Sequence, residues 1–212
     1  EVLEEGAIED PEAARRFVAR IREATLRIER LLNDLLGLAR IEARGVESFD
    51  PVELGRVAQQ VRATLLEGAE RVALRTEGDT RVRGDATWLG RAIANLLDNA
   101  LVHSAPDTPV EVEVRRGATD VTLAVRSQGE VVRHVRTRLF RRFVSTRLDR
   151  GGTGLGLAIV RAVAESHGGR AELVSEGPPT VEFRLVLPTA WHHPQAETGA
   201  GGTALAGPAN SL

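Results

Sequence analysis

The 212-residue chain contains no cysteine, lysine or methionine, and these absences exclude several kinds of site. Without cysteine there are neither disulfides nor thiolate metal centres. All 28 basic residues are arginine, which excludes a Walker phosphate loop because that motif requires a lysine. Methionine is missing even at the first position, so we expect the chain to be a piece of a longer protein.

Aromatic residues and long apolar runs are also scarce. Aromatics make up 3% of a chain that is 42% hydrophobic, so the core must be built from Leu, Val, Ile and Ala. No run approaches the roughly 18 apolar residues of a membrane span, and no signal peptide is recognisable. The net charge of −2 gives no general attraction to nucleic acid or to membranes. We therefore expect no nucleic-acid partner, and a membrane connection only through missing upstream segments.

Residues 11–43 have the pattern of one long helix. Apolar residues recur there in alternating steps of four and three, which is a heptad seam: Phe17, Ile21, Ala24, Ile28, Leu31, Leu35 and Leu38. A second stripe (Leu32, Leu36 and Ala39) widens the apolar face, so we expect this helix to pack in a bundle, with packing on its own domain as the alternative.

The remaining pattern alternates between helices and strands. It predicts helices over residues 51–67 and 86–103, and strand pairs around the turns at 117–120 and 177–180. Two shorter strands are expected at 71–77 and 80–85. The small, Gly- and Pro-rich tail at 191–212 is expected to be disordered, and its His192 and His193 to be solvated rather than metal-bound.

The stretch "GGTGLGLAIV" places four glycines among the six residues 151–156, directly before an apolar helical pattern. Glycines let a ligand approach the main chain closely, and a helix start offers free N–H groups and partial positive charge. This arrangement favours phosphate binding. The alternative is a flexible connector before an ordinary core helix. A dinucleotide fingerprint is disfavoured because no apolar strand precedes the glycines.

Amide and imidazole groups share one face of the predicted helix at 86–103. Asn95 and Asn99 lie four residues apart, and His103 follows one turn later. Amide oxygens can complete the coordination of Mg²⁺, although two asparagines at this spacing are also compatible with surface or capping roles.

Four segments resemble those of the sensor histidine kinases, within the GHKL superfamily of ATPases and kinases. "NLLDNALVHS" resembles the N box, "LFRRF" the F box and "GGTGLGLAIV" the G2 box, while "LLNDLLGLARIEARG" resembles the second helix of the dimerisation hairpin. The resemblance implies an α+β fold, a two-layer α/β sandwich of the Bergerat type preceded by a long dimerisation helix. It divides the chain into a partial dimerisation and phosphotransfer hairpin (1–48), an ATP-binding catalytic domain (49–190) and the tail (191–212).

The resemblance also implies a set of binding residues and partners. Asn99 would bind Mg²⁺, and the N-terminal part of the glycine segment would close over the triphosphate of ATP. The implied ATP-binding residues are Asn95, Asn99, His103, Ser127, Gly129, Gly152, Thr153, Gly154, Leu155, Gly156 and Leu157. Seven arginines between residues 127 and 150 would lie near an anionic ligand, with a solvated basic loop as the alternative: 133, 136, 138, 141, 142, 147 and 150.

The function implied is that of a two-component sensor histidine kinase. It would form a homodimer through helix 11–43, act on a response regulator, and be the cytoplasmic portion of a membrane-anchored bacterial protein. Phosphoryl transfer needs an acceptor histidine, and residues 1–44 contain none, so the acceptor is expected outside this chain.

Two departures from the family pattern leave a second interpretation open. Ser127 stands where the G1 box of the family has an aspartate that reads adenine, and Val131 replaces its second glycine. These changes are compatible with a pseudokinase, a signalling module with weak or no ATP binding. A serine kinase of the anti-sigma type is disfavoured because that group does not need the long helix.

Overall fold

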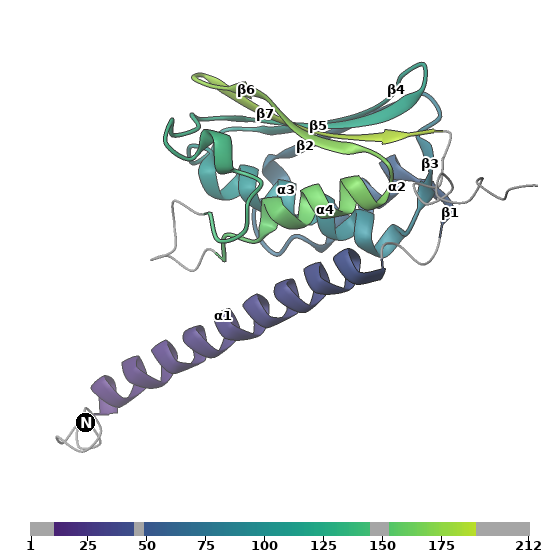
Figure 1. The fold of residues 1–212 in the computed structure, drawn as a ribbon. Helices are drawn as coiled ribbons and strands as arrows, with labels where there is room; N and C mark the ends of the chain where they lie inside the picture. The colour runs from purple at the N-terminus through teal and green to yellow at the C-terminus, as the bar shows by residue number, and fades with distance from the viewer. Residues whose placement is uncertain (1–10, 45–48, 145–152, 190–212) are drawn as a thin grey trace, which may run out of the picture.

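The structure, a computed structural model, describes residues 11–44, 49–144 and 153–189. One face of a five-stranded sheet is covered by three helices, and a long helix, α1 (Pro11–Arg44), extends away beneath them (Figure 1). The expected two-layer α/β sandwich with a preceding long helix is confirmed. The tail at 191–212, expected to be disordered, lies outside the described residues. Among the described residues, no helix is both long and apolar enough to cross a bilayer.

The sheet has the strand order β2-β4-β5-β7-β6. Its strands are β2 (Val72–Glu77), β4 (Val110–Arg116), β5 (Asp120–Gln128), β6 (Arg170–Glu176) and β7 (Thr180–Pro188). β2 pairs with β4 in parallel, and the other neighbours are antiparallel. Side chains alternate between the two faces of a strand, so the apolar positions of each strand collect on one face.

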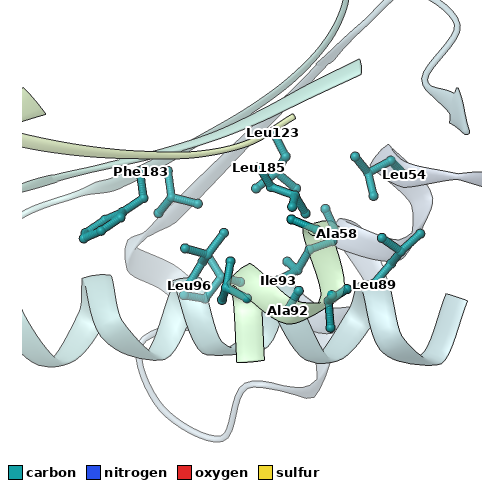
Figure 2. Close-up of a cluster of buried hydrophobic side chains, with 14 of the residues drawn as sticks. Leu54, Ala58, Leu89, Ala92, Ile93, Leu96, Leu123, Phe183 and Leu185 are labelled. Carbon is teal, nitrogen blue, oxygen red and sulfur yellow. The ribbon is translucent and has the colours of Figure 1, made fainter. Parts of the chain in front are cut away.

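The core lies between that apolar face and the helices α2 (Leu54–Thr64), α3 (Ala86–His103) and α4 (Gly156–Ser166). Figure 2 shows Leu89, Ile93 and Leu96 of α3 directed toward Leu123 and Leu185 of the sheet. All five are at most 1% exposed. The core is thus aliphatic, as the composition predicts, and it fixes α3 and α4 against the same face of the sheet.

The expected helix at 51–67 is wrong at its start. Residues Asp50–Glu53 form a strand, β1, which pairs antiparallel with β3 (Arg81–Gly84). Helix α2 begins only at Leu54, because the Glu53 carboxylate accepts a hydrogen bond from the Arg56 amide (2.7 Å) and caps its first turn. The apolar residue Val52 belongs to the strand and not to the helical stripe.

Helix α1 contacts the sandwich only through its C-terminal part. Leu38 and Ile41 are buried against the core (1% and 4% exposed), and burial of such side chains contributes roughly 1.5–3 kcal/mol each. The seam residues Ile21, Ile28 and Leu35 remain exposed, with 50%, 65% and 43% of their surface accessible. The expected seam is therefore divided between packing on the helix's own domain and an open apolar face.

The buried His167 joins the end of α4 to the start of α3. Its Nε2 accepts a hydrogen bond from the Asp85 amide (3.1 Å), and its Nδ1 lies 2.7 Å from the Val163 carbonyl, to which it donates. This pattern fits the neutral imidazole, in which one nitrogen donates and the other accepts. Burial lowers the pKa of His167, against the opposing effects of the Val163 carbonyl and of Asp85.

We expect the free energy of unfolding to decrease as the pH falls below about 6.5, where His167 becomes protonated in the unfolded chain but resists protonation in the folded one. One such group contributes at most about 1.4 kcal/mol per pH unit. Urea unfolding between pH 5 and 7.5 measures this dependence. His167→Gln should flatten it, and the exposed control His134→Gln should not; the same slope in all three proteins would contradict this role.

Candidate functional site

The start of α4 lies directly against the middle of α3. A Cβ added to Gly156, the first residue of α4, would lie 2.9 Å from the Oδ1 atom of Asn95, so a larger residue at position 156 would press on the Asn95 side chain. The Asn95 side chain is oriented by its Nδ2 atom, which donates to the Arg91 carbonyl (2.9 Å). The two segments named by the sequence analysis are therefore adjacent.

The next two positions on the same face of α3 follow Asn95 toward the end of the helix. Asn99 is half-buried, and its side chain makes no hydrogen bond to any residue that the structure describes. His103 ends α3, and its carbonyl oxygen would lie 3.4 Å from a Cβ added to Gly129. The asparagine face thus leads from the start of α4 to the loop that follows β5.

Ser127 lies near the end of β5, opposite Val110 and Val181. It lies an even number of residues after the buried Val121, Leu123 and Val125 on the strand, so its side chain is on the same face as theirs, toward the helices. Its hydroxyl makes no hydrogen bond within the described part of the chain, which leaves it available to a ligand.

The loop after β5 is fixed by the turn between β6 and β7. The Gly129 amide donates to the Pro179 carbonyl (2.8 Å), and the Val131 amide donates to the Glu176 carbonyl (2.8 Å). A Cβ on Gly177 would lie 2.0 Å from the Gly129 oxygen, so the turn and the loop pack backbone to backbone. The main chain at Val131 is thereby held in place although the second glycine of the G1 box is missing.

The segment leading into α4 is built around Thr153 and Gly154. The Thr153 hydroxyl accepts a hydrogen bond from the Leu155 amide (3.2 Å), and Leu155 itself is completely buried. Gly154 has a φ of 68°, in the left-handed region that favours glycine. A Cβ there would lie 2.8 Å from the Phe143 carbonyl carbon, so the chain before and after residues 145–152 is held together at this point.

The structure describes some of the remaining expected site residues and not others. Leu157 is partly buried against the core, as expected of a helix residue, whereas Gly152 lies outside the described residues. Of the seven arginines, Arg147 and Arg150 also lie outside them. Arg136 forms an ion pair with Glu176, so its charge is already partly neutralised.

Asp34 and Arg91, which the sequence pattern did not indicate, contact this site from α1 and α3. Arg91 donates through Nη2 to Asp34 Oδ1 (2.9 Å), and the Thr153 hydroxyl donates to Asp34 Oδ2 (3.3 Å). The available signal was an acidic residue inside the apolar stretch "LLNDLL". The pattern alone could not show that this residue meets a partner 119 positions away.

The chemistry of these groups suits a metal-bound anion. Helix α4 begins with free amides and partial positive charge, and the Asn99 oxygen is a ligand type that Mg²⁺ accepts. Among the described residues there is no group of three or more His, Asp or Glu side chains that could hold a metal ion by itself.

Comparison with known proteins identifies the family. Residues 84–190 match the model of the "Histidine kinase-, DNA gyrase B-, and HSP90-like ATPase" family. The chain belongs to this family. The matched range contains α3, α4 and the loop after β5, so the family likeness covers the site described above, and the resemblance to the sensor histidine kinase catalytic domain is confirmed.

Curated relatives are named as sensor histidine kinases. The probable sensor histidine kinase TcrY of Mycobacterium tuberculosis is 37% identical over 188 residues, covering 85% of this chain and 39% of the relative. The sensor-like histidine kinase SenX3 of Mycolicibacterium smegmatis is 31% identical over 192 residues, covering 85% of this chain and 50% of the relative. The chain thus spans half or less of the length of these relatives.

A solved structure shares the fold over most of the chain. Full-length ShkA in complex with AMPPNP superposes with a TM-score of 0.68 at 26% identity, covering 84% of this chain and 40% of that one. Because 84% coverage exceeds the sandwich alone, the likeness includes part of the long helix.

Proposed function

We propose that the chain is the catalytic portion of a two-component sensor histidine kinase and that it binds Mg-ATP between α3 and α4. The main-chain amides of Thr153, Gly154 and Gly156 would hold the polyphosphate. Gly152, Leu155 and Leu157 would belong to the same binding segment. Asn99 would hold Mg²⁺ and Asn95 would shape the phosphate site. His103, Ser127 and Gly129 would border the nucleobase.

The observation that carries this proposal is the approach of Gly156 to Asn95, at 2.9 Å from an added Cβ to Oδ1. It brings a helix N-terminus, which attracts anions, beside an asparagine face that can supply an oxygen ligand. Mg²⁺, when bound, supplies positive charge next to the polyphosphate. The chain's own contribution is to position the phosphates by fixed donors, which is the main requirement of phosphoryl transfer.

The phosphoryl acceptor would be a histidine outside this chain, and an aspartate of a response regulator would receive the group afterwards. Residues 1–44 contain no histidine, and the exposed His134 lies in the segment after β5. We also propose that the chain is the cytoplasmic portion of a membrane-anchored protein, since it spans half or less of the length of relatives named as sensor histidine kinases.

A second candidate function, a pseudokinase with weak or no ATP binding, is favoured by Ser127. A neutral hydroxyl replaces a carboxylate as the acceptor for the adenine amino group, and charge-assisted hydrogen bonds are about twice as strong as neutral ones. The lost strength of about 1.5–3 kcal/mol corresponds to a ten- to hundredfold weaker affinity.

Calorimetry with a non-hydrolysable ATP analogue and Mg²⁺ distinguishes the two functions. Binding by the wild-type chain supports the kinase, and no saturation at millimolar ligand supports the pseudokinase. We expect Ser127→Asp to bind the analogue at least about tenfold more tightly, because it restores a charged acceptor. Gln128→Asp is the control, since it adds the same charge on the opposite face of β5. Equal effects of both substitutions would contradict a direct contact of residue 127 with the base.

We further propose that the exposed seam of α1 forms a homodimer interface. Ile28 is 65% exposed, more than Ile21 or Leu35 of the same seam, and exposed apolar faces of this kind mark interaction sites. We expect Ile28→Glu to reduce self-association by at least about tenfold, measured by analytical ultracentrifugation. Ala19→Glu, outside the heptad seam on the same helix, is the control. A wild-type chain that stays monomeric at high concentration would contradict the interface.

A further inference from the structure

A polar cluster joins the long helix to the start of α4. It consists of Asp34 on α1, Arg91 on α3 and Thr153 before α4. One Arg91 nitrogen donates to both the Asn33 carbonyl (2.8 Å) and the Asp34 carboxylate (2.9 Å), and the second carboxylate oxygen of Asp34 accepts from the Thr153 hydroxyl (3.3 Å). Both charged side chains are largely covered, with 20% of Asp34 and 29% of Arg91 exposed.

Neighbouring residues hold the Arg91 guanidinium in this position. It lies 5.5 Å from the centre of the Trp88 ring, a distance suited to a cation–π contact. It also crosses α1 at Gly37, where a Cβ would lie 2.5 Å from Arg91 Nη1. A side chain at position 37 would therefore shift the end of the Arg91 side chain, although residue 37 carries no charge itself.

The cluster places a carboxylate beside the end of α4 that attracts anions. Thr153 is two residues before Leu155, its hydroxyl accepts a hydrogen bond from the Leu155 amide, and α4 begins at the next residue, Gly156. The partial positive charge of a helix N-terminus favours a negative group within its first turn. In this structure Asp34 is such a group, and it is supplied by a different element from the one that carries the phosphate-binding residues.

We propose that the Asp34 carboxylate competes with the nucleotide polyphosphate for the start of α4. Packing of α1 on the sandwich and binding of nucleotide would then oppose each other. This inference rests on the proposed nucleotide site. The Thr153 hydroxyl has one proton and cannot donate it to Asp34 and to a phosphate oxygen at once. A polyphosphate at the start of α4 also meets the negative charge of Asp34 at short range.

The opposition works in both directions. By linkage, if docking of α1 weakens nucleotide binding by some factor, nucleotide binding weakens docking by the same factor. Bound nucleotide would thus loosen α1 around residue 34, and whatever pulls α1 from the sandwich would raise nucleotide affinity. The lower end of α1 in Figure 1 extends far from the sandwich, so a force on that end can act on the contact.

The test measures affinity for the β,γ-imido analogue of ATP with Mg²⁺ by calorimetry, in the full chain. We expect Asp34→Asn, Gly37→Ala and Arg91→Gln each to bind the analogue about five- to tenfold more tightly than the wild type. Glu29→Gln, which removes one negative charge from an exposed position of the same helix, is the matched control and should not change affinity. Amide hydrogen exchange over residues 31–41 should accelerate when the analogue is added to the wild type.

Arg91→Gln decides between competition and simple attraction by charge. If Arg91 merely attracts phosphate, its removal weakens binding, whereas release of Asp34 strengthens it. Weaker binding by Arg91→Gln, or unchanged affinity for Gly37→Ala together with unchanged exchange, would overturn the proposal while leaving the nucleotide site intact. Failure of every variant and of the wild type to bind the analogue would overturn the proposed function as well.

Discussion

Replacing Asn99 with alanine is expected to weaken Mg-dependent nucleotide binding by about a hundredfold or more. The amide lies on the face of α3 that leads from Gly156 to Gly129, and it has no hydrogen-bond partner among the described residues. Its removal therefore breaks no hydrogen bond within the described residues, and we expect the fold to remain stable. Calorimetry with the non-hydrolysable analogue, with and without Mg²⁺, measures the effect. Asn99→Asp should also reduce affinity, because it adds negative charge beside the polyphosphate.

The control for Asn99→Ala is Gln60→Ala, which removes an exposed amide from α2. It should leave the affinity and its dependence on Mg²⁺ unchanged. Residual binding by Asn99→Ala that no longer depends on Mg²⁺ would support the assignment of the metal ligand. Full, Mg-dependent binding by Asn99→Ala would remove Asn99 from the site.

The long periodic elements could be predicted from the sequence because their pattern is local. The helix at Ala86–His103 has the predicted bounds, since its start is marked by Asp85, which caps it, and its apolar stripe is continuous. The four strands β4 to β7 alternate as predicted. The short strand β1 was missed, because four residues carry too little pattern and Glu53 could be either a strand end or a helix cap.

The contacts between distant residues could not be predicted. Asp34 and Arg91 are separated by 57 positions, and nothing in the heptad pattern indicates that one end of the seam packs on its own domain. The seam predicts an apolar partner but does not say which one, so Leu38 could not be distinguished from Ile28. The role of His167 also depends on the fold, because its partner Asp85 lies 82 positions away.

The sequence predicted which two segments form the candidate site, but not the contacts that hold them. The glycines and the asparagine face each indicated phosphate or metal binding, and the structure places Gly156 beside Asn95. The sequence could not show that Val131 keeps its main-chain contact with Glu176 despite the missing glycine. That hydrogen bond is made by the backbone, so the identity of the side chain does not determine it.

Gly154→Ala is expected to reduce nucleotide affinity at least about tenfold while the sandwich stays folded. A left-handed conformation costs about 1–2 kcal/mol for a residue with a Cβ. At position 154 the added Cβ would in addition lie 2.8–2.9 Å from backbone atoms of Phe143 and Val144, which cannot yield as a flexible side chain can. The two ends of the segment that leads into α4 would be pushed apart, and Thr153 with them.

Gly168→Ala separates this effect from backbone strain. Gly168 follows the end of α4 with nearly the same φ, 70° against 68°, but within the described residues its Cβ would meet only Pro188 Cγ at 3.6 Å, an ordinary contact. In both variants the left-handed conformation should lower the free energy of unfolding, measured with urea, by a similar amount. Only Gly154→Ala should also lose affinity for the ATP analogue. Equal affinities in the two variants would mean that the chain before α4 does not position the phosphates, and the binding role of Thr153 and Gly154 would then be wrong.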